Sequence, residues 1–209
     1  MNPLATSPEL GSPRLPLALE QLLPWYSVNE TRSIGDLAAI GTKTLALFCS
    51  KKCPGSLIIR MHDLTHAIRD SGLTAIGGFH SPVEKECFSV LLEGNQPLII
   101  CPARSLENMR VPADWRDPMK AGRLLVLSPF GRKERRATAN LALKRNEFVA
   151  AVADTIIVAH ASRGRAIEQL CRKALIWKKR VITFKCPETL NLVQIGAEPV
   201  GQIPVDRLG

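Results

Sequence analysis

The sequence is poor in aromatic residues and has no long apolar run. Phe, Trp and Tyr together make up 5% of the 209 residues. No apolar stretch reaches the roughly 18–20 residues that a membrane span requires. The N-terminal residues also lack the basic segment and long apolar region of a secretory leader. We therefore expect a cytoplasmic protein with no membrane partner.

Cysteine is present, but not in the patterns that bind metals or cross-link small secreted domains. The chain contains no CxxC pair, and its cysteines are too sparse for a disulfide scaffold. The segment "CSKKC" places two cysteines four residues apart, but no second Cys or His pair follows at zinc-site spacing. The sequence thus predicts no metal and no cofactor. The six cysteines are Cys49, Cys53, Cys87, Cys101, Cys171 and Cys186.

The rest of the composition is that of a folded, basic domain. Apolar residues make up 45% of the chain, and the formal net charge is +9. A basic domain concentrates phosphate-bearing partners around itself. The placement of this charge along the chain therefore bears directly on function.

From Lys43 onward, short apolar runs alternate with segments of helical periodicity. The runs are rich in Ile, Val and Leu without polar alternation, which is typical of strands buried on both faces. This order predicts an α/β fold: a doubly wound, mostly parallel, Rossmann-like sheet with helices on both faces. The candidate strands are residues 44–49, 73–76, 97–101, 123–127, 155–159 and 180–184. The candidate helices are "SLIIRMHDLTHAIRDSG", "SPVEKECFSVLLEG", a short "RSLENM", "TANLALKRNEFVAAV" and "RAIEQLCRKALIWKK".

We expect three regions along the chain. Residues 1–35 are rich in proline and predict an N-terminal arm with one short helix at "LALEQLL". Residues 36–190 hold the Rossmann-like domain. Residues 191–209 form a C-terminal extension that is too short for a second domain, although "TLNLVQIGA" could add a small helix or an edge strand.

The turn after the first strand favours a phosphate ligand. In doubly wound sheets, ligands bind outside the carboxyl ends of the strands. Ser50, Lys51 and Lys52 follow the first strand directly and can add donors to the backbone N–H groups of the next helix start. The alternative is a solvated basic turn.

The turn after the second strand, "GGFHSPVEKEC", combines two kinds of signal. Residues 81–84 have the Ser-Pro-x-Glu pattern of a capping box with proline at the first helical position. That pattern does not explain Gly77 and Gly78, which allow close approach by a ligand. Nor does it explain His80, which we expect to point into the crevice.

Basic residues also follow two later strands. We expect one basic loop after the fourth strand, followed by a helix that starts near residue 135. The loop after the fifth strand offers a histidine, a glycine and two arginines, with a hydrogen-bonded core role as the alternative for that histidine. A solvated charged face is the usual explanation of such runs, but here they lie at the ligand-binding edge. The candidate residues are Arg132, Arg135, Arg136, Arg145, Asn146, His160, Arg163, Gly164 and Arg165.

These segments resemble the DNA-processing protein A (DprA, Smf) family, within the broader superfamily (SLOG) that includes LOG-type nucleotide hydrolases. "LALFCSKKCPG" is similar to the family's strand and Gly-Ser-Arg turn, with Ser50 and Lys51 on the serine and arginine. "GLTAIGGFHSPVEKECFSVLLEG" resembles its second glycine-containing turn, and "RLLVLSPFG" its "LLSEYPPG" segment. The stretch from Arg145 to Phe184 is similar to the family segment that begins "RNRIIAGLSDAVLVVEA".

The resemblance implies a protein that binds single-stranded DNA in a basic pocket at the sheet edge, forms a homodimer and partners a recombinase. Compact members of this family also occur beside phage-defence and toxin–antitoxin genes, so an antitoxin or regulatory role with a toxin partner is a further hypothesis. The pocket residues that it implies are Ser50, Lys51, Gly77, Gly78, His80, Arg145, Asn146, Gly164 and Arg165.

Three functional interpretations follow, and the first is favoured. The chain is a binding protein without catalysis, in which Phe79, Phe130 or Trp115 would stack on bases. Alternatively, it is a nucleotide-binding sensor or a LOG-type hydrolase with Glu168 or Glu84 as the carboxylate, although Glu168 is more simply a solvent-facing residue near a helix start. Third, it is an interaction module whose arm docks on a partner.

Overall fold

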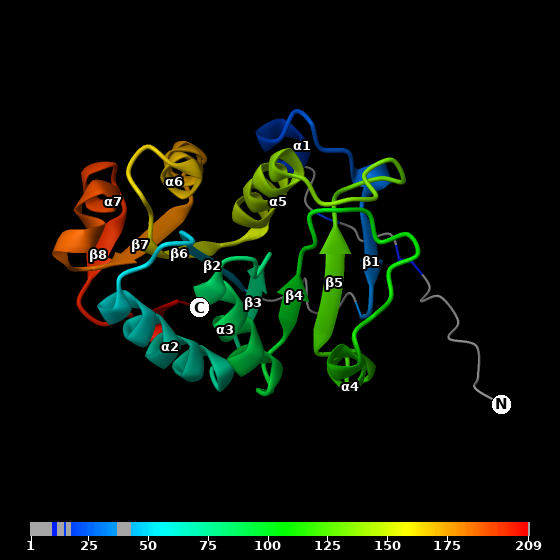
Figure 1. The fold of residues 1–209 in the computed structure, drawn as a ribbon, viewed down its shortest axis with the longest axis horizontal. Helices are drawn as coiled ribbons and strands as arrows, with labels where there is room; N and C mark the ends of the chain where they lie inside the picture. The colour runs from blue at the N-terminus through cyan, green and yellow to red at the C-terminus, as the bar shows by residue number, and fades with distance from the viewer. Residues whose placement is uncertain (1–9, 12–14, 16–17, 37–42, 209) are drawn as a thin grey trace.

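The computed structural model describes residues 10–11, 15, 18–36 and 43–208 and has an eight-stranded sheet at its centre (Figure 1). The strand order is β1-β5-β4-β3-β2-β6-β7-β8. β1 pairs antiparallel with β5, and every other pair of neighbours is parallel. The predicted doubly wound α/β fold is therefore confirmed.

All six predicted strands occur, with ends shifted by two residues at most. The two further strands, β1 and β8, form the edges of the sheet. The bounds are β1 (Arg32–Ile34), β2 (Thr44–Cys49), β3 (Thr74–Gly77), β4 (Leu98–Ile100), β5 (Leu124–Ser128), β6 (Thr155–His160), β7 (Arg180–Phe184) and β8 (Glu198–Val200).

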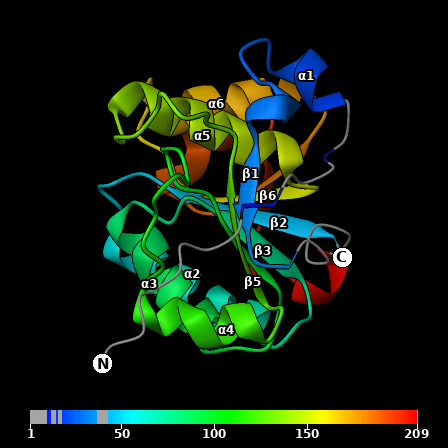
Figure 2. The same ribbon diagram turned by 90° about the vertical axis from the view of Figure 1, so that its right-hand side faces the viewer.

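Helices cover both faces of the sheet (Figure 2). One layer contains α1 (Ala18–Leu22), α5 (Ala139–Val152) and α6 (Ala166–Ile176). The opposite layer contains α2 (Gly55–Arg69), α3 (Pro82–Leu92) and α4 (Arg116–Lys120). The short α7 (Leu190–Gln194) leads into β8.

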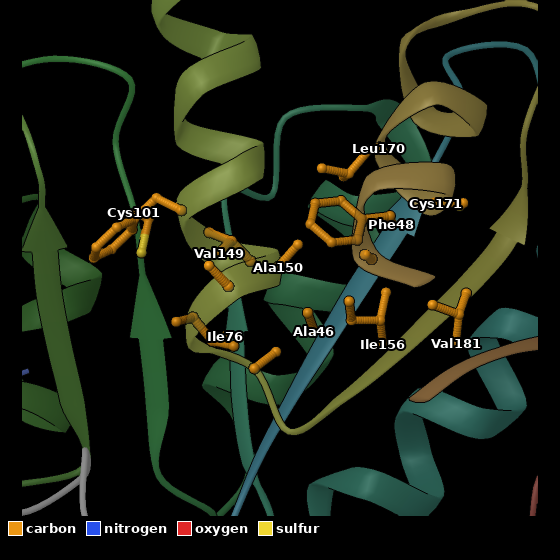
Figure 3. Packing of buried hydrophobic residues seen from close by; sticks show 14 of the residues in the cluster. Ala46, Phe48, Ile76, Cys101, Val149, Ala150, Ile156, Leu170, Cys171 and Val181 are labelled. Atoms are coloured by element: carbon orange, nitrogen blue, oxygen red, sulfur yellow. The ribbon is translucent and has the colours of Figure 1, made fainter. Parts of the chain in front are cut away.

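The central strands are apolar throughout because both of their faces are buried. Along β2, Ala46 and Phe48 face the layer of α5 and α6, whereas Leu45 and Leu47 face the layer of α2 and α3. Figure 3 shows Phe48 packed with Leu170 of α6. Strands with this environment have no polar face, which is why hydrophobic runs alone located them.

The predicted helix at "RSLENM" does not form. Residues 104–109 form a loop that is tied to the β5–α5 connection: the Ser105 N–H donates to the Glu134 carbonyl at 2.8 Å, and Ser128 Oγ donates to the Arg104 carbonyl at 2.7 Å. The Arg104 carbonyl, which would accept a bond within a helix, is thus engaged by Ser128 instead. The helix of the β4–β5 connection is α4, which lies further along the chain.

Helix α5 begins later than the sequence suggested. Its first residue is Ala139, and the Thr138 hydroxyl accepts from the Leu141 N–H as the N-cap. The expected start near Arg135 was wrong because Thr138 provides the cap. Arg145 and Asn146 therefore lie about two turns into the helix.

The two terminal segments both contribute strands to the sheet. β1 comes from residues 1–35 and β8 from residues 191–209. Tyr26 is buried against Phe148 of α5, with ring centroids 5.5 Å apart, and the Trp25 indole N–H donates to Glu147 at 3.1 Å. Both aromatic rings thus pack on their own chain, with Tyr26 buried and Trp25 half-buried.

Candidate functional site

The site lies where the chain changes direction at the carboxyl edge of the sheet. β2 lies between β3 and β6; the chain builds outward through β3, β4 and β5 on one side and through β6, β7 and β8 on the other. The loop after β2 leads to α2 on one face of the sheet and the loop after β6 leads to α6 on the other, so the chain diverges between β2 and β6. Doubly wound proteins bind ligands at such a switch point. This edge lies at the top of Figure 1, where β5 points.

Ser50 joins the loops that follow β2 and β6. Its N–H donates to the His160 carbonyl at 2.9 Å, and its buried hydroxyl accepts from the Ser162 N–H at 3.1 Å. Lys51 and Lys52 are exposed next to it, and neither ammonium has a partner within the described part of the chain. Ser50 therefore fixes the loop, and the two lysines can reach an anion.

Glu84 braces the turn after β3. The capping box is present: Ser81 Oγ accepts from the Glu84 N–H at 3.3 Å, and Glu84 Oε2 accepts from the N–H groups of Ser81 at 3.2 Å and His80 at 2.9 Å. Glu84 Oε1 also accepts from the Cys49 N–H at 2.9 Å. This buried carboxylate thus links the end of β2 to the turn after β3.

His80 is exposed beside this brace, with its ring free of any partner among the described residues. Gly77 has a packing explanation instead of a ligand-binding one. A Cβ at position 77 would lie 2.9 Å from the Phe79 ring, which folds back onto the chain at a φ of 45°. Within this turn Gly78 is half-buried and His80 is exposed, whereas Gly77, Phe79 and Ser81 are buried.

Of the aromatic residues suggested as base-stacking partners, Phe79 and Phe130 are buried and Trp115 is half-buried. The ring centroids of Phe79 and Phe88 lie 5.0 Å apart, and those of Phe88 and Trp115 lie 5.5 Å apart. Phe130 is buried under Trp25, with ring centroids 6.0 Å apart. The stacking expectation was wrong for Phe79 and Phe130, because these faces are already covered.

Arg145 is a buried cation at the centre of the edge. Its side chain is 4% exposed. Nη1 donates to the Cys101 carbonyl at 2.9 Å, and Nε donates to Asn146 Oδ1 at 2.8 Å. Gly78 lies directly against the guanidinium. Burial lowers the pKa of Arg145, and the nearby Glu84 carboxylate opposes this shift.

The β5–α5 loop supplies further cations at the outer part of the edge. Arg132 pairs with Glu107. Lys133, Arg135 and Arg136 are exposed and have no partner in the described ranges. This loop therefore presents three cations to solvent and one ion pair.

Glu168 is buried, and the expectation that it faces solvent was wrong. Its Oε2 accepts from Asn191 Nδ2 at 2.7 Å and from the Gly164 N–H at 3.4 Å, and its Oε1 accepts from Arg172 at 3.0 Å. The hydrogen bond from Asn191, followed by that from Arg172, lowers the pKa of Glu168. Its carboxylate therefore links three parts of the chain: Gly164 of the β6–α6 loop, Arg172 of α6 and Asn191 of α7.

Asn191 of α7 supports the β6–α6 loop, a role that the sequence did not reveal. It donates to the Ala161 carbonyl at 2.9 Å as well as to Glu168. A single asparagine so far along the sequence gives no sign that it supports the loop before α6. Within the same loop, Gly164 has a φ of +68°, and Arg163 donates to Gln194 at 3.2 Å.

His160 ends β6 with one ring nitrogen buried and unpaired. Its Nδ1 has no hydrogen-bond partner among the described residues. Buried polar atoms are normally satisfied, so this unpaired nitrogen is an exception among the polar atoms of the edge. It lies beside the loop that Ser50 fixes.

The structure thus brings the predicted residues to one edge in two groups. The residues of the inner group are buried or half-buried, and those of the outer group are exposed basic side chains. No set of three or more metal-ligating side chains gathers in the described part of the chain. None of the helices described there combines the length and apolar character that crossing a bilayer requires. The inner group is Ser50, Gly78, Arg145, Asn146 and His160; the outer group is Lys51, Lys52, His80, Lys133, Arg135, Arg136, Arg163 and Arg165.

Comparison with known proteins shows the fold. No protein-family model and no curated protein matches the sequence. DNA processing protein A from Helicobacter pylori, described by its mode of binding single-stranded DNA, has 16% identity and a TM-score of 0.75 over 96% of this chain and 94% of that chain. DNA processing protein A from Streptococcus pneumoniae has 16% identity and a TM-score of 0.69 over 94% and 72%, respectively.

The fold is also similar, more distantly, to that of the molybdenum cofactor binding protein from Rippkaea orientalis. It has 12% identity and a TM-score of 0.53 over 77% of this chain and 90% of that chain. The predicted resemblance to DNA-processing protein A is therefore confirmed at the level of the fold.

Proposed function

We propose that the protein binds single-stranded DNA through phosphate contacts at the carboxyl edge of the sheet. One observation carries this proposal: three loops place unpaired cations along that edge, while the nearby carboxylates Glu84 and Glu168 are both committed to hydrogen bonds within the chain. Exposed cations gathered in this way attract a polyanion. The fold shared with two DNA processing A proteins supports the same ligand class.

The binding mode is dominated by the DNA backbone. Sequence-tolerant binding of single strands usually combines phosphate contacts with stacking of bases on aromatic side chains. The edge has many cations, whereas its aromatic rings at positions 79 and 130 are buried. We therefore expect weak preference among base sequences and a strong response to salt.

A titration of labelled oligothymidine at several salt concentrations tests the proposal. The logarithm of the association constant should fall linearly with the logarithm of salt concentration, by about 0.7 for each phosphate neutralised on a single strand. Competition with an unlabelled duplex and with single-stranded RNA of equal length separates the three polyanions. Salt-independent binding, or no binding at low salt, would contradict the proposal.

A small nucleotide or phosphorylated cofactor is the second candidate ligand. Arg145 is held by the Cys101 carbonyl and Asn146, which leaves a fixed cation at the edge that suits one phosphate group. The fold is also shared with a molybdenum cofactor binding protein. Titration with nucleoside monophosphates, with assay of released base, tests this sensor or hydrolase alternative. Saturable binding that excludes oligothymidine would favour it, and release of base would assign catalysis.

The homodimer and the protein partners, a recombinase or a toxin, are proposals that follow from the resemblance alone. So is a role in DNA processing or phage defence. Light scattering of the full chain with and without oligothymidine measures the mass of the assembly. A mass equal to one chain under both conditions would contradict the dimer.

A further inference from the structure

Helix α2 carries two histidines one turn apart on its outer face. His62 and His66 approach each other with their Nε2 atoms 3.2 Å apart and their ring centroids 4.5 Å apart. The His62 side chain is 55% exposed. The buried face of the helix carries other residues, among them Met61, Leu64 and Ile68, so the histidine pair supports neither the core nor the carboxyl-edge site.

The separation of the two nitrogens matches that of a shared metal ion. Imidazole nitrogens bind zinc at about 2.0–2.1 Å, so two of them at tetrahedral angles lie about 3.3–3.4 Å apart. His62 Nε2 and His66 Nε2 are already within about 0.2 Å of that spacing. Two histidines at this helical spacing are the arrangement that zinc-binding helices use.

We propose that His62 and His66 bind one divalent transition-metal ion of the imidazole-preferring class, Zn²⁺, Cu²⁺ or Ni²⁺, with water in the remaining positions. Asp63 Oδ1 lies 3.9 Å from the other ring nitrogen of His62 and adds negative charge that favours the cation. Since the protein supplies two ligands, the ion is exchangeable and has open positions, unlike the closed four-ligand sites that support folds.

The expectation of no metal was based on the spacing of the cysteines. That spacing carries no information about the histidine pair of α2. The site also stands apart from the proposed DNA interface. His62 lies seven positions after the first residue of α2, about 10 Å along the helix axis. A bound ion would cross-link the second and third turns of α2 and bring added positive charge to the helix that follows Lys51 and Lys52.

Calorimetric titration of the full-length protein with ZnCl₂ tests the site, with NiCl₂ as a second probe. One ion per chain should bind, and binding should weaken in acid because protons compete with the metal for the imidazole nitrogens. Loss of even an outer-shell partner costs about 10- to 100-fold in metal affinity. His62→Ala and His66→Ala should each therefore weaken binding by at least about tenfold.

His80→Ala is the matched control, because it removes an exposed histidine elsewhere and should leave zinc affinity unchanged. The half-buried thiols Cys53 and Cys186 are other zinc donors, so the double variant H62A/H66A is measured as well. The proposal is overturned if the wild-type protein takes up neither ion, or if the double variant binds zinc as tightly as the wild type. Neither result would alter the salt-dependent DNA binding predicted above.

Discussion

Gly78 lies so close to the guanidinium of Arg145 that a Cβ atom at position 78 would come within 1.6 Å of Nη1. Arg145 cannot move aside freely, because it is buried and donates to the Cys101 carbonyl and to Asn146. Gly78→Ala should therefore lower the free energy of unfolding by about 1–3 kcal/mol, the usual cost of overpacking, and weaken oligothymidine binding. Urea denaturation and a binding titration measure the two effects.

Gly201→Ala is the control for this change. A Cβ at position 201 meets nothing within 4 Å, so the substitution should cost no stability and no DNA affinity. Equal stability of the two variants would show that the guanidinium of Arg145 is free to move.

The lysines after β2 should account for part of the salt dependence. Replacing both Lys51 and Lys52 by Ala should weaken binding and reduce the slope against the logarithm of salt concentration by about 1.4, since each phosphate contact contributes about 0.7. Lys120→Ala provides the control, because Lys120 ends α4 just before β5 and so lies at the opposite edge of the sheet. An unchanged slope in the double variant would remove these lysines from the interface.

Ser81 and His80 are adjacent but should respond in opposite ways. Ser81→Ala removes the N-cap of α3 and should lower the free energy of unfolding by about 1 kcal/mol, with little effect on DNA binding. His80→Ala leaves the cap intact, since the His80 contact to Glu84 is made by the backbone N–H, and should weaken binding with little loss of stability. The converse pattern would reverse the two roles.

Glu168 should make the protein sensitive to acid. Its pKa is lowered in the folded state by Asn191 and then by Arg172. The stabilisation is therefore complete above the unfolded pKa of glutamate, about 4.3, and is lost as the pH falls through the folded value. Glu168→Gln should be less stable than the wild type near neutral pH, and the difference should shrink in acid.

Urea midpoints across the acid range measure this effect. Glu86→Gln, on the exposed side of α3, removes a carboxylate without these hydrogen bonds and serves as the control. A stability difference between Glu168→Gln and the wild type that is the same at every pH would show that the carboxylate charge does not contribute.

Hydrophobic runs were sufficient to predict the interior of the fold. Strands buried on both faces leave an unbroken apolar signal, and the capping box at Ser81 was readable from its spacing alone. The edge strands β1 and β8 were not readable, because they have three residues each and one of them contains a proline. The loop at residues 104–109 was misread because its partners lie in a distant connection.

The site was predictable in location but only partly in the roles of its residues. Topology alone sends the residues after β2, β3 and β6 to one edge. Which of them contact a ligand depends on packing: Glu84 and Glu168 are scaffolding, Gly77 accommodates Phe79, and Arg145 is buried. A sequence shows that a carboxylate exists but does not show that backbone N–H groups already occupy it.

Strand β1 gives a warning for experiments that shorten the chain. It covers the outer edge of β5 in antiparallel register, so a fragment starting at residue 36 would leave the backbone N–H and C=O groups of β5 open to a neighbouring molecule. Such a fragment should self-associate on size-exclusion chromatography. That association would be an artefact of the cut, and it would imitate the dimer that the experiment was meant to detect.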